Sequence, residues 1–320
     1  SAAGTAATPC STATRSSGCW RLPAPTAGID RVSPHPGRAA VLPALALVVN
    51  AFTWGVSWWP LRELQGVGLH ALWATVLIYA VAVGLISLRA PRAWAELART
   101  PSLWVLVLAA GTTNASFNWA VTVGDVVRVV LLFYVMPLWA VLLARVLLGE
   151  RLTAPALLRV ALALAGAAIV LWPADGGSWP LPRTPAEVLG VIGGFSFALN
   201  NVMLRREADR SASARALAMF LGGVVVSAAL ALASAAPAPP PPAVGWIAGM
   251  LALALAFLGG NLALQYGAAR LPANATAVIM ITEVLFASVS ALLLGAGTLT
   301  PALAIGGALI VLASLLAVRG

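Results

Sequence analysis

The sequence predicts an all-α integral membrane protein with ten transmembrane helices, arranged as two inverted five-helix repeats around a central cavity. Three observations lead to this prediction: an apolar composition, a series of long apolar runs, and an internal repeat. Hydrophobic residues make up 61% of the 320-residue chain and charged residues 9%, against about 45–50% and about 25% in soluble domains. A water-soluble fold is therefore excluded.

Ten apolar runs have the length of a membrane span. A helix that crosses the hydrocarbon core needs roughly 20 apolar residues, and the segments between the runs are short, many of them rich in Pro and Gly. A β-barrel is disfavoured, because its strands alternate apolar and polar residues over about ten positions. The predicted spans are residues 40–59, 69–88, 103–122, 126–148, 155–173, 185–204, 214–234, 244–264, 273–295 and 301–318.

The basic residues, all of them arginine, predict the direction of the spans. With a cytoplasmic N-terminus, fifteen of the 19 fall in cytoplasmic segments, Arg159 falls within a span, and only Arg62, Arg128 and Arg183 fall outside. The positive-inside rule therefore places both termini in the cytoplasm. Arginine without lysine fits a GC-rich bacterial genome, so we expect a multi-pass protein of the bacterial inner (plasma) membrane. Nucleic acid is not expected as a partner, because the arginines lie between apolar runs and not on a solvated patch.

Residues 1–39 are predicted to form a disordered N-terminal segment, because they are rich in Ser, Thr, Ala and Pro and bury little apolar area. The segment fits either an over-extended bacterial reading frame or an organelle transit peptide, so its presence in the mature protein stays open. Both cysteines, Cys10 and Cys19, lie in it, which leaves no disulfide framework or zinc site in the apolar body.

Two stretches suggest an internal duplication: NAFTWGVSWWPLR at residues 50–62 and GFSFALNNVMLR at residues 194–205. The predicted repeats cover residues 40–173 and 185–318. Because each has an odd number of helices, the second is inverted, an arrangement that recurs in secondary transporters with a site at the midplane. An offset of 143 pairs Phe52 with Phe195, Leu61 with Leu204 and Arg62 with Arg205, and an offset of 147 pairs Asn114 with Asn261, Asn118 with Gln265 and Trp119 with Tyr266.

The segments WGVSWWPLR, PLWAVLLARVLLGERL, FSFALNNVMLRR and TEVLFASVSALLLG, in this order, resemble EamA-type transporters of the drug/metabolite transporter superfamily. The resemblance covers residues 40–318 and implies ten helices around a cavity, with alternating-access transport of small metabolites, often export. Two positions depart from the family pattern, which commonly has Glu-Pro at Glu283-Val284 and Glu in the loop at Ala296-Gly297. At these points the resemblance supports neither a helix kink nor coupling chemistry in the second repeat.

Polar side chains recur on single faces of four predicted spans, at i, i+4 and i, i+7 spacing. An amide facing lipid would leave its donors and acceptors unsatisfied, so these faces are predicted to point inward. They either line a substrate cavity or hold helices together by hydrogen bonds; the matching pairs in both repeats favour a cavity. The candidates are Asn50, Trp54, Ser57, Trp58, Asn114, Asn118, Asn200, Asn201, Asn261 and Gln265.

Three further residues are candidates for coupling, substrate charge or movement. Glu283 is the one carboxylate deep within a predicted span, where ionisable groups often mark proton paths or substrate contacts; alternatively, it pairs with an amide or arginine and fixes its helix. Arg128 either binds a substrate carboxylate or extends to the membrane interface. Pro137, in the middle of the fourth span, is predicted to kink it and is the candidate hinge.

The expected function is secondary transport, as an exporter of small metabolites such as amino acids by alternating access, with proton coupling as a hypothesis. The expected partners are a small-molecule substrate, the lipid bilayer and a proton; no cofactor or metal is expected, and the oligomeric state stays open. A non-transporting membrane scaffold is the main alternative. An intramembrane enzyme is disfavoured, because the only histidines are His35 and His70, and no P-loop, HExxH or GxSxG motif occurs.

Overall fold

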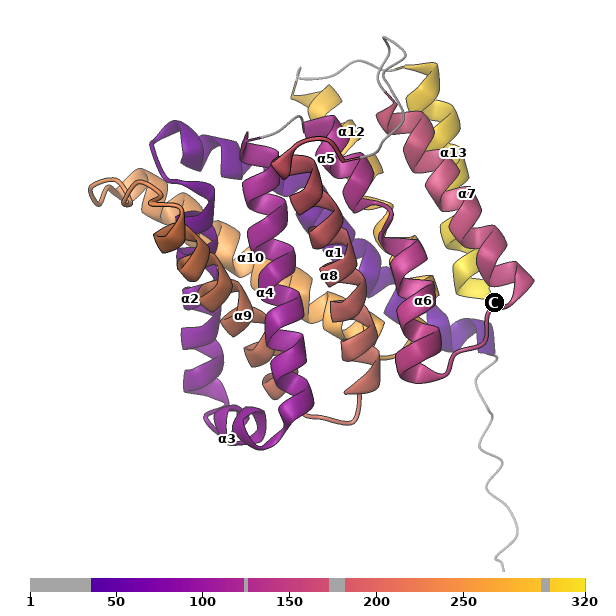
Figure 1. The fold of residues 1–320 in the computed structure, drawn as a ribbon, viewed down its shortest axis with the longest axis horizontal. Helices are drawn as coiled ribbons and strands as arrows, with labels where there is room; N and C mark the ends of the chain where they lie inside the picture. The colour runs from indigo at the N-terminus through magenta and orange to yellow at the C-terminus, as the bar shows by residue number, and fades with distance from the viewer. Residues whose placement is uncertain (1–35, 124–125, 173–181, 295–299, 320) are drawn as a thin grey trace, which may run out of the picture. The chain divides into compact units, whose positions relative to one another are not determined.

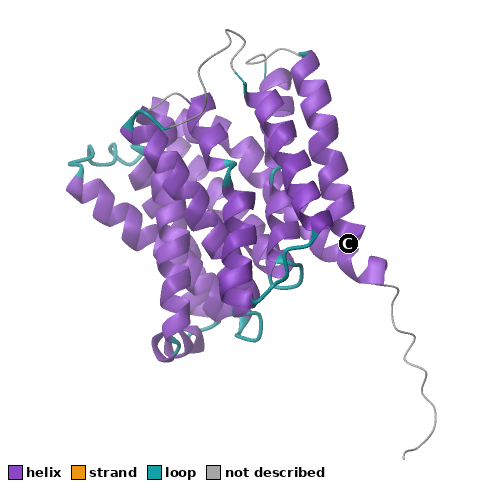
Figure 2. Cartoon of the chain, turned by 45° about the vertical axis from the view of Figure 1, so that its right-hand side comes forward, coloured by secondary structure: helices purple, strands orange, loops and turns teal. Residues whose placement is uncertain are grey.

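Thirteen α-helices make up the secondary structure of the described residues (Figures 1 and 2). The computed structural model describes residues 36–123, 126–172, 182–294 and 300–319, without the side chains at 36–39, 121–128, 131, 171, 291 and 319. The described residues belong to one compact unit. The helices are α1 (Pro36–Gly66), α2 (Ala71–Arg89), α3 (Arg92–Arg99), α4 (Pro101–Val123), α5 (Val126–Phe133), α6 (Met136–Leu148), α7 (Ala154–Leu171), α8 (Pro185–Arg206), α9 (Ala212–Ala233), α10 (Val244–Ala268), α11 (Ala273–Met280), α12 (Glu283–Leu293) and α13 (Pro301–Arg319).

The prediction of an all-helical protein with several membrane spans is confirmed. Seven helical segments among the described residues are long and apolar enough to cross a membrane: α1, α2, α8, α9, α10, the α11–α12 pair and α13. Helices α6 and α7 are apolar but shorter. Large apolar side chains stay exposed along the helices, for example Leu108 (61%) and Leu255 (60%), as expected of surfaces that face lipid.

Near the N-terminus, the helices differ from the predicted spans. Helix α1 begins at Pro36, inside the segment predicted to be disordered, and continues past Pro60 to Gly66. The remainder of that segment, residues 1–35, lies outside the described residues. Helix α3 was not predicted. It is short and amphipathic, with Ala93 and Leu97 buried and Trp94 exposed, a pattern that a search for continuous apolar runs does not find.

The predicted span 126–148 is two helices, α5 and α6, separated at Tyr134 and Val135. Pro137 has no backbone N–H, so it cannot complete the helical bond to the carbonyl four residues earlier. The backbone instead forms tighter bonds, from the Val135 N–H to the Leu132 carbonyl at 3.3 Å and from the Leu138 N–H to the Val135 carbonyl at 3.0 Å. The chain therefore breaks just before Pro137.

The predicted span 273–295 also breaks, into α11 and α12, although it contains no proline at this point. The break lies at Ile281 and Thr282, where the Thr282 N–H donates to the Ile279 carbonyl at 3.0 Å and its hydroxyl donates to the same oxygen at 2.8 Å. The two breaks, at Tyr134 and Ile281, are separated by the same 147-residue offset that pairs the repeated amides.

Helices α4 and α9 pack closely because glycines face each other at their contact. A Cβ on Gly222 would overlap the carbonyl oxygen of Val107, and one on Gly111 would overlap the carbonyl oxygen of Gly222. Small residues of this kind let helix backbones approach in membranes. The largest buried apolar cluster draws on α1, α4, α8, α9, α11 and α13, among others.

Four connections between helices meet at one end of this unit, which we call the arginine-rich end: the α2–α4 connection with α3, and the α6–α7, α8–α9 and α10–α11 connections (lower part of Figure 1). Glu96 in α3 accepts from Ser211, Arg205 donates to the Ala269 carbonyl at 2.7 Å, and the first backbone N–H of α11 donates to Glu150 at 3.5 Å. This end carries Arg89, Arg92, Arg99, Arg145, Arg151, Arg205, Arg206, Arg210, Arg215 and Arg270.

Candidate functional site

Two adjoining pockets lie between the helices and together form what we call the central cavity. They share Trp54, Thr113, Asn114 and Phe197. Their volumes are about 20 and 30 Å³, room for one or two water molecules, so the cavity is narrow in this conformation. The first pocket is also lined by Tyr79, Ala110, Asn200, Met219, Phe220, Asn261 and Leu264, and the second by Phe117, Phe133 and Glu283.

Tyr79 joins Asn114 and Asn261, the first members of the two repeated amide pairs. Its hydroxyl donates to Asn114 Oδ1 at 2.7 Å and is also hydrogen-bonded to the Asn261 side chain. Both amides are held by their own helices as well, because each Nδ2 donates to the carbonyl four residues earlier, Ala110 at 2.7 Å and Phe257 at 2.9 Å. Residues 147 positions apart in the chain therefore meet at one buried phenol.

Glu283 is the acidic residue of the central cavity. It is partly buried, it begins α12 directly after the break, and its carboxyl group is hydrogen-bonded to Tyr134, which lies at the other break. The two helix breaks thus meet through one side-chain pair. Such a pair can hold a proton or a substrate ammonium group.

Aromatic rings form most of the apolar wall. Trp54 packs on Phe257 with ring centroids 4.4 Å apart, and Phe133 packs on Phe117 at 4.8 Å and on Phe197 at 5.8 Å. These spacings are typical of favourable aromatic contacts. The cavity can therefore enclose an apolar or aromatic group of a ligand.

The amides of α8 and α1 are less well satisfied. Asn200 Nδ2 donates to Asn201 Oδ1 at 3.3 Å, and Asn50 Nδ2 lies 3.6 Å from the sulfur of Met280. Within the described residues, Asn200 Oδ1, Asn201 Nδ2 and Asn50 Oδ1 are buried without a hydrogen-bond partner. Of these three residues only Asn200 lines the cavity, where its oxygen is available to a ligand.

Asn118 and Gln265, the second members of the repeated amide pairs, lie one helical turn beyond the cavity, toward opposite ends of the helical unit. Asn118 Nδ2 donates to the Thr75 hydroxyl at 2.6 Å, which joins α4 to α2. Gln265 Oε1 accepts from Arg215 Nε at 3.3 Å, which joins α10 to α9 at the arginine-rich end. The cavity is thus flanked by two polar contacts between corresponding helices.

The other predicted residues lie apart from the cavity lining. Trp58 donates to Ser290 at 2.9 Å, and the Ser57 hydroxyl donates to the Trp54 carbonyl at 2.7 Å. Pro137 lies in the first turn of α6. The side chain of Arg128 lies outside the described residues. Among the residues that the structure describes, no group of three His, Cys, Asp or Glu side chains could hold a metal ion.

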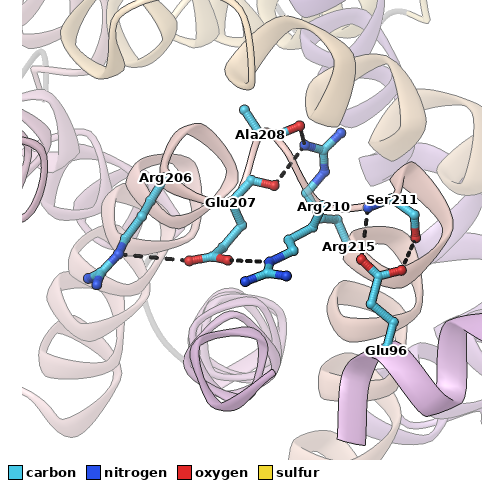
Figure 3. A network of polar contacts seen from close by, with 7 residues as sticks. All are labelled: Glu96, Arg206, Glu207, Ala208, Arg210, Ser211 and Arg215. Atoms are coloured by element: carbon cyan, nitrogen blue, oxygen red, sulfur yellow. Dashed lines mark hydrogen bonds and ion pairs between the residues drawn. The ribbon is translucent and has the colours of Figure 1, made fainter. Parts of the chain in front are cut away.

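A polar network joins the α8–α9 connection to α3 at the arginine-rich end (Figure 3). Glu207 pairs with Arg206 at 3.8 Å and with Arg210 at 3.5 Å. The hydroxyl of Ser211 and its backbone N–H both donate to the Glu96 carboxylate. These bonds, the hydroxyl's more than the N–H's, lower the pKa of that carboxyl from its ordinary value of 4.5. The α8–α9 connection is thereby fixed to α3.

Sequence reasoning missed three residues that organise the site: Tyr79, Tyr134 and Arg215. A tyrosine inside an apolar run was a usable signal for the first two, because a buried phenol needs a hydrogen-bond partner. Arg215 was counted with the cytoplasmic arginines, and its position near the end of a span gave no sign of burial.

Part of the chain is similar to known transporters. Residues 41–172 match the EamA-like transporter family. The chain is 34% identical over 114 residues to an uncharacterized transporter of Pseudomonas aeruginosa, covering 34% of this chain and 37% of that protein. It is 33% identical over 129 residues to the chloramphenicol-sensitive protein RarD of the same organism, covering 38% of this chain and 42% of RarD. The matched segments thus span less than half the length of each relative.

One solved structure, titled "Crystal structure of protein", shares the fold over most of both chains. Its TM-score is 0.69 at 20% sequence identity, and the alignment covers 86% of this chain and 96% of that one. At this identity the likeness concerns the fold alone.

Proposed function

Since the chain carries an EamA-like transporter domain over residues 41–172, we propose that it is a secondary transporter that exports small metabolites, such as amino acids, by alternating access. The observation that carries this proposal is the central cavity, which combines aromatic walls with amides and one carboxylate. A zwitterion with an apolar side chain fits such a lining, because the polar groups satisfy its charges and the rings enclose its side chain.

We propose that the spans number ten, with α4, α5–α6 and α7 as three passes beside the seven long segments, and that residues 40–173 and 185–318 are inverted repeats. Three observations support this: the helix breaks at Tyr134 and Ile281 share the repeat offset, Asn114 and Asn261 meet at Tyr79, and Asn118 and Gln265 lie toward opposite ends. The arginine-rich end is assigned to the cytoplasm of a bacterial inner membrane.

Asn118 and Gln265 then belong to two related gates. The Thr75–Asn118 contact closes the cavity toward the outside, and the Arg215–Gln265 contact closes it toward the cytoplasm. Alternating access requires each to open while the other stays closed. Proton coupling is assigned to Glu283, whose protonation would follow the side to which the cavity is open.

Counterflow in proteoliposomes tests the proposal. Wild-type protein preloaded with unlabelled amino acids is expected to accumulate labelled ones, and Asn118→Ala and Gln265→Ala are each expected to slow exchange at least several-fold, because each removes one gate contact. Asn274→Ala is the matched control, since the amide oxygen of Asn274 accepts only a local bond, from the Ala275 N–H at 2.7 Å.

Unchanged exchange in both gate variants would contradict the two-gate proposal. If no amino acid or related metabolite exchanges in the wild type, the protein is a membrane scaffold and not a carrier.

A further inference from the structure

Arg215 is the one buried arginine in the described part of the chain, with 5% of its surface exposed. It lies on α9, one helical turn from Met219, and its partner Gln265 lies on α10, one turn from Asn261. Met219 and Asn261 both line the central cavity. The backbone positions of Arg215 and Gln265 therefore lie one helical turn from cavity-lining residues, on the arginine-rich side.

The hydrogen bonds of this guanidinium go to neutral oxygens (Figure 3). Nη1 donates to the carbonyls of Glu207 at 3.0 Å and Ala208 at 2.6 Å, and Nε donates to Gln265. The charges of Arg270, Glu96, Asp209 and Glu207 act on it through space, but none of the described carboxylates forms an ion pair with it. A buried cation without an ion-pair partner is costly.

The opposite side of the cavity has a polar contact at the corresponding position. There the corresponding contact, from Asn118 to Thr75, is formed by two neutral side chains at 2.6 Å. Fixing α9 to α10 would need no more than this. The guanidinium of Arg215 differs from this contact in its charge and in its further bonds to the α8–α9 connection.

Gln265 offers a second donor beside Arg215. Its side chain is 2% exposed, and its Nε2 group is buried without a hydrogen-bond partner in the described residues. Two donors on facing helices, one of them cationic, form the set that a carboxylate accepts from best.

We propose that Arg215 and Gln265 bind the carboxylate group of the transported metabolite at the arginine-rich end of the cavity. This inference rests on the transport function proposed above and deepens it, because it requires a substrate that carries a carboxylate. On binding, the carboxylate accepts from the guanidinium and from Gln265 Nε2–H, and the contact between α9 and α10 gives way.

Ligand-dependent thermal stability of the purified full-length protein tests this without a transport assay. The probes are the proteinogenic amino acids, each compared with its own amide, in which a neutral group replaces the carboxylate. At least one acid is expected to raise the melting temperature, while its amide has no such effect. Equal stabilisation by acid and amide, or none by any acid, overturns the proposal.

Three variants locate the effect. Arg215→Lys keeps the charge but loses the planar donor set, and it is expected to weaken binding of the acid about ten-fold or more. Gln265→Glu places a carboxylate beside Arg215, so it is expected to raise the melting temperature without ligand and to abolish stabilisation by acids. Arg151→Gln is the control, because this exposed arginine lies at the same end of the unit, in the α6–α7 connection, and is not among the charges that act on Arg215. Full acid binding in Gln265→Glu overturns the proposal, even if Arg215→Lys does not fold.

Failure of this inference can be told apart from failure of the transport function. If amino acids and their amides exchange at equal rates in counterflow, the protein is a transporter but Arg215 is not a carboxylate site. If acids bind through Arg215 and nothing exchanges, the site stands and the transport function falls.

Discussion

Replacing Glu283 by glutamine is expected to abolish the dependence of export on a pH gradient while the protein stays folded. Glu283 is the one carboxylate among the described residues that line the cavity. Glutamine has nearly the same shape and can keep the contact with Tyr134, but it cannot take up or release a proton. Uptake of labelled substrate into proteoliposomes, with and without an imposed pH gradient, measures the effect.

Two further variants make this test specific. Glu150→Gln removes a carboxylate at the α6–α7 connection, far from the cavity lining, and is expected to leave the pH-gradient dependence intact. Tyr134→Phe removes the hydrogen bond but keeps the carboxylate, so it is expected to alter the rate and retain the dependence. If Glu283→Gln still responds to the gradient as the wild type does, proton coupling through this residue is wrong.

Replacing Gly222 by valine is expected to produce the largest loss of stability among single substitutions in the helix contacts. Any Cβ at this position meets the Val107 carbonyl and the Gly111 backbone, which cannot move without separating α4 from α9. Overpacking of this kind costs about 1–3 kcal/mol or more. Thermal unfolding in detergent, followed by tryptophan fluorescence, should show a clearly lower melting temperature than that of the wild type.

Gly249→Ala in α10 is the matched control. No atom lies within 4 Å of a Cβ placed there, and alanine is favoured over glycine in a helix by about 1 kcal/mol. The control is expected to match or slightly exceed the wild-type stability. Equal melting temperatures for Gly222→Val and Gly249→Ala would show that α4 and α9 do not pack as described.

Most helices could be predicted because a membrane span must be both long and apolar. The predicted span 185–204 corresponds to α8 (Pro185–Arg206), and the predicted span 301–318 corresponds to α13 (Pro301–Arg319). Amides such as Asn114 were predicted to face inward from the cost of exposing them to lipid, and Asn114 does line the cavity. These predictions needed only length, polarity and helical spacing.

Other features depend on contacts between distant segments, which residue spacing does not reveal. The break at Ile281 lacks the proline that usually marks one, and it involves a threonine that bonds its own backbone. Tyr79 acquires its role only because α2 brings it between Asn114 and Asn261. Arg215 was interpreted as a topology signal. Its burial could not be predicted from the sequence, because it depends on how the α8–α9 connection folds over the guanidinium.

The most direct test of the account is whether water reaches Asn114 and Asn261, the paired amides of the two halves. Asn114→Cys and Asn261→Cys are compared with Leu108→Cys and Leu255→Cys, all in a protein that lacks Cys10 and Cys19. The two leucine positions also differ by 147 residues, and their side chains are exposed on the outer surface of the helices. Intact vesicles are treated with a membrane-impermeant maleimide during transport.

The account predicts that the two cavity positions are labelled, that excess substrate protects them, and that the two leucine positions are not labelled. Labelling of the leucine positions with none at the asparagine positions would contradict it.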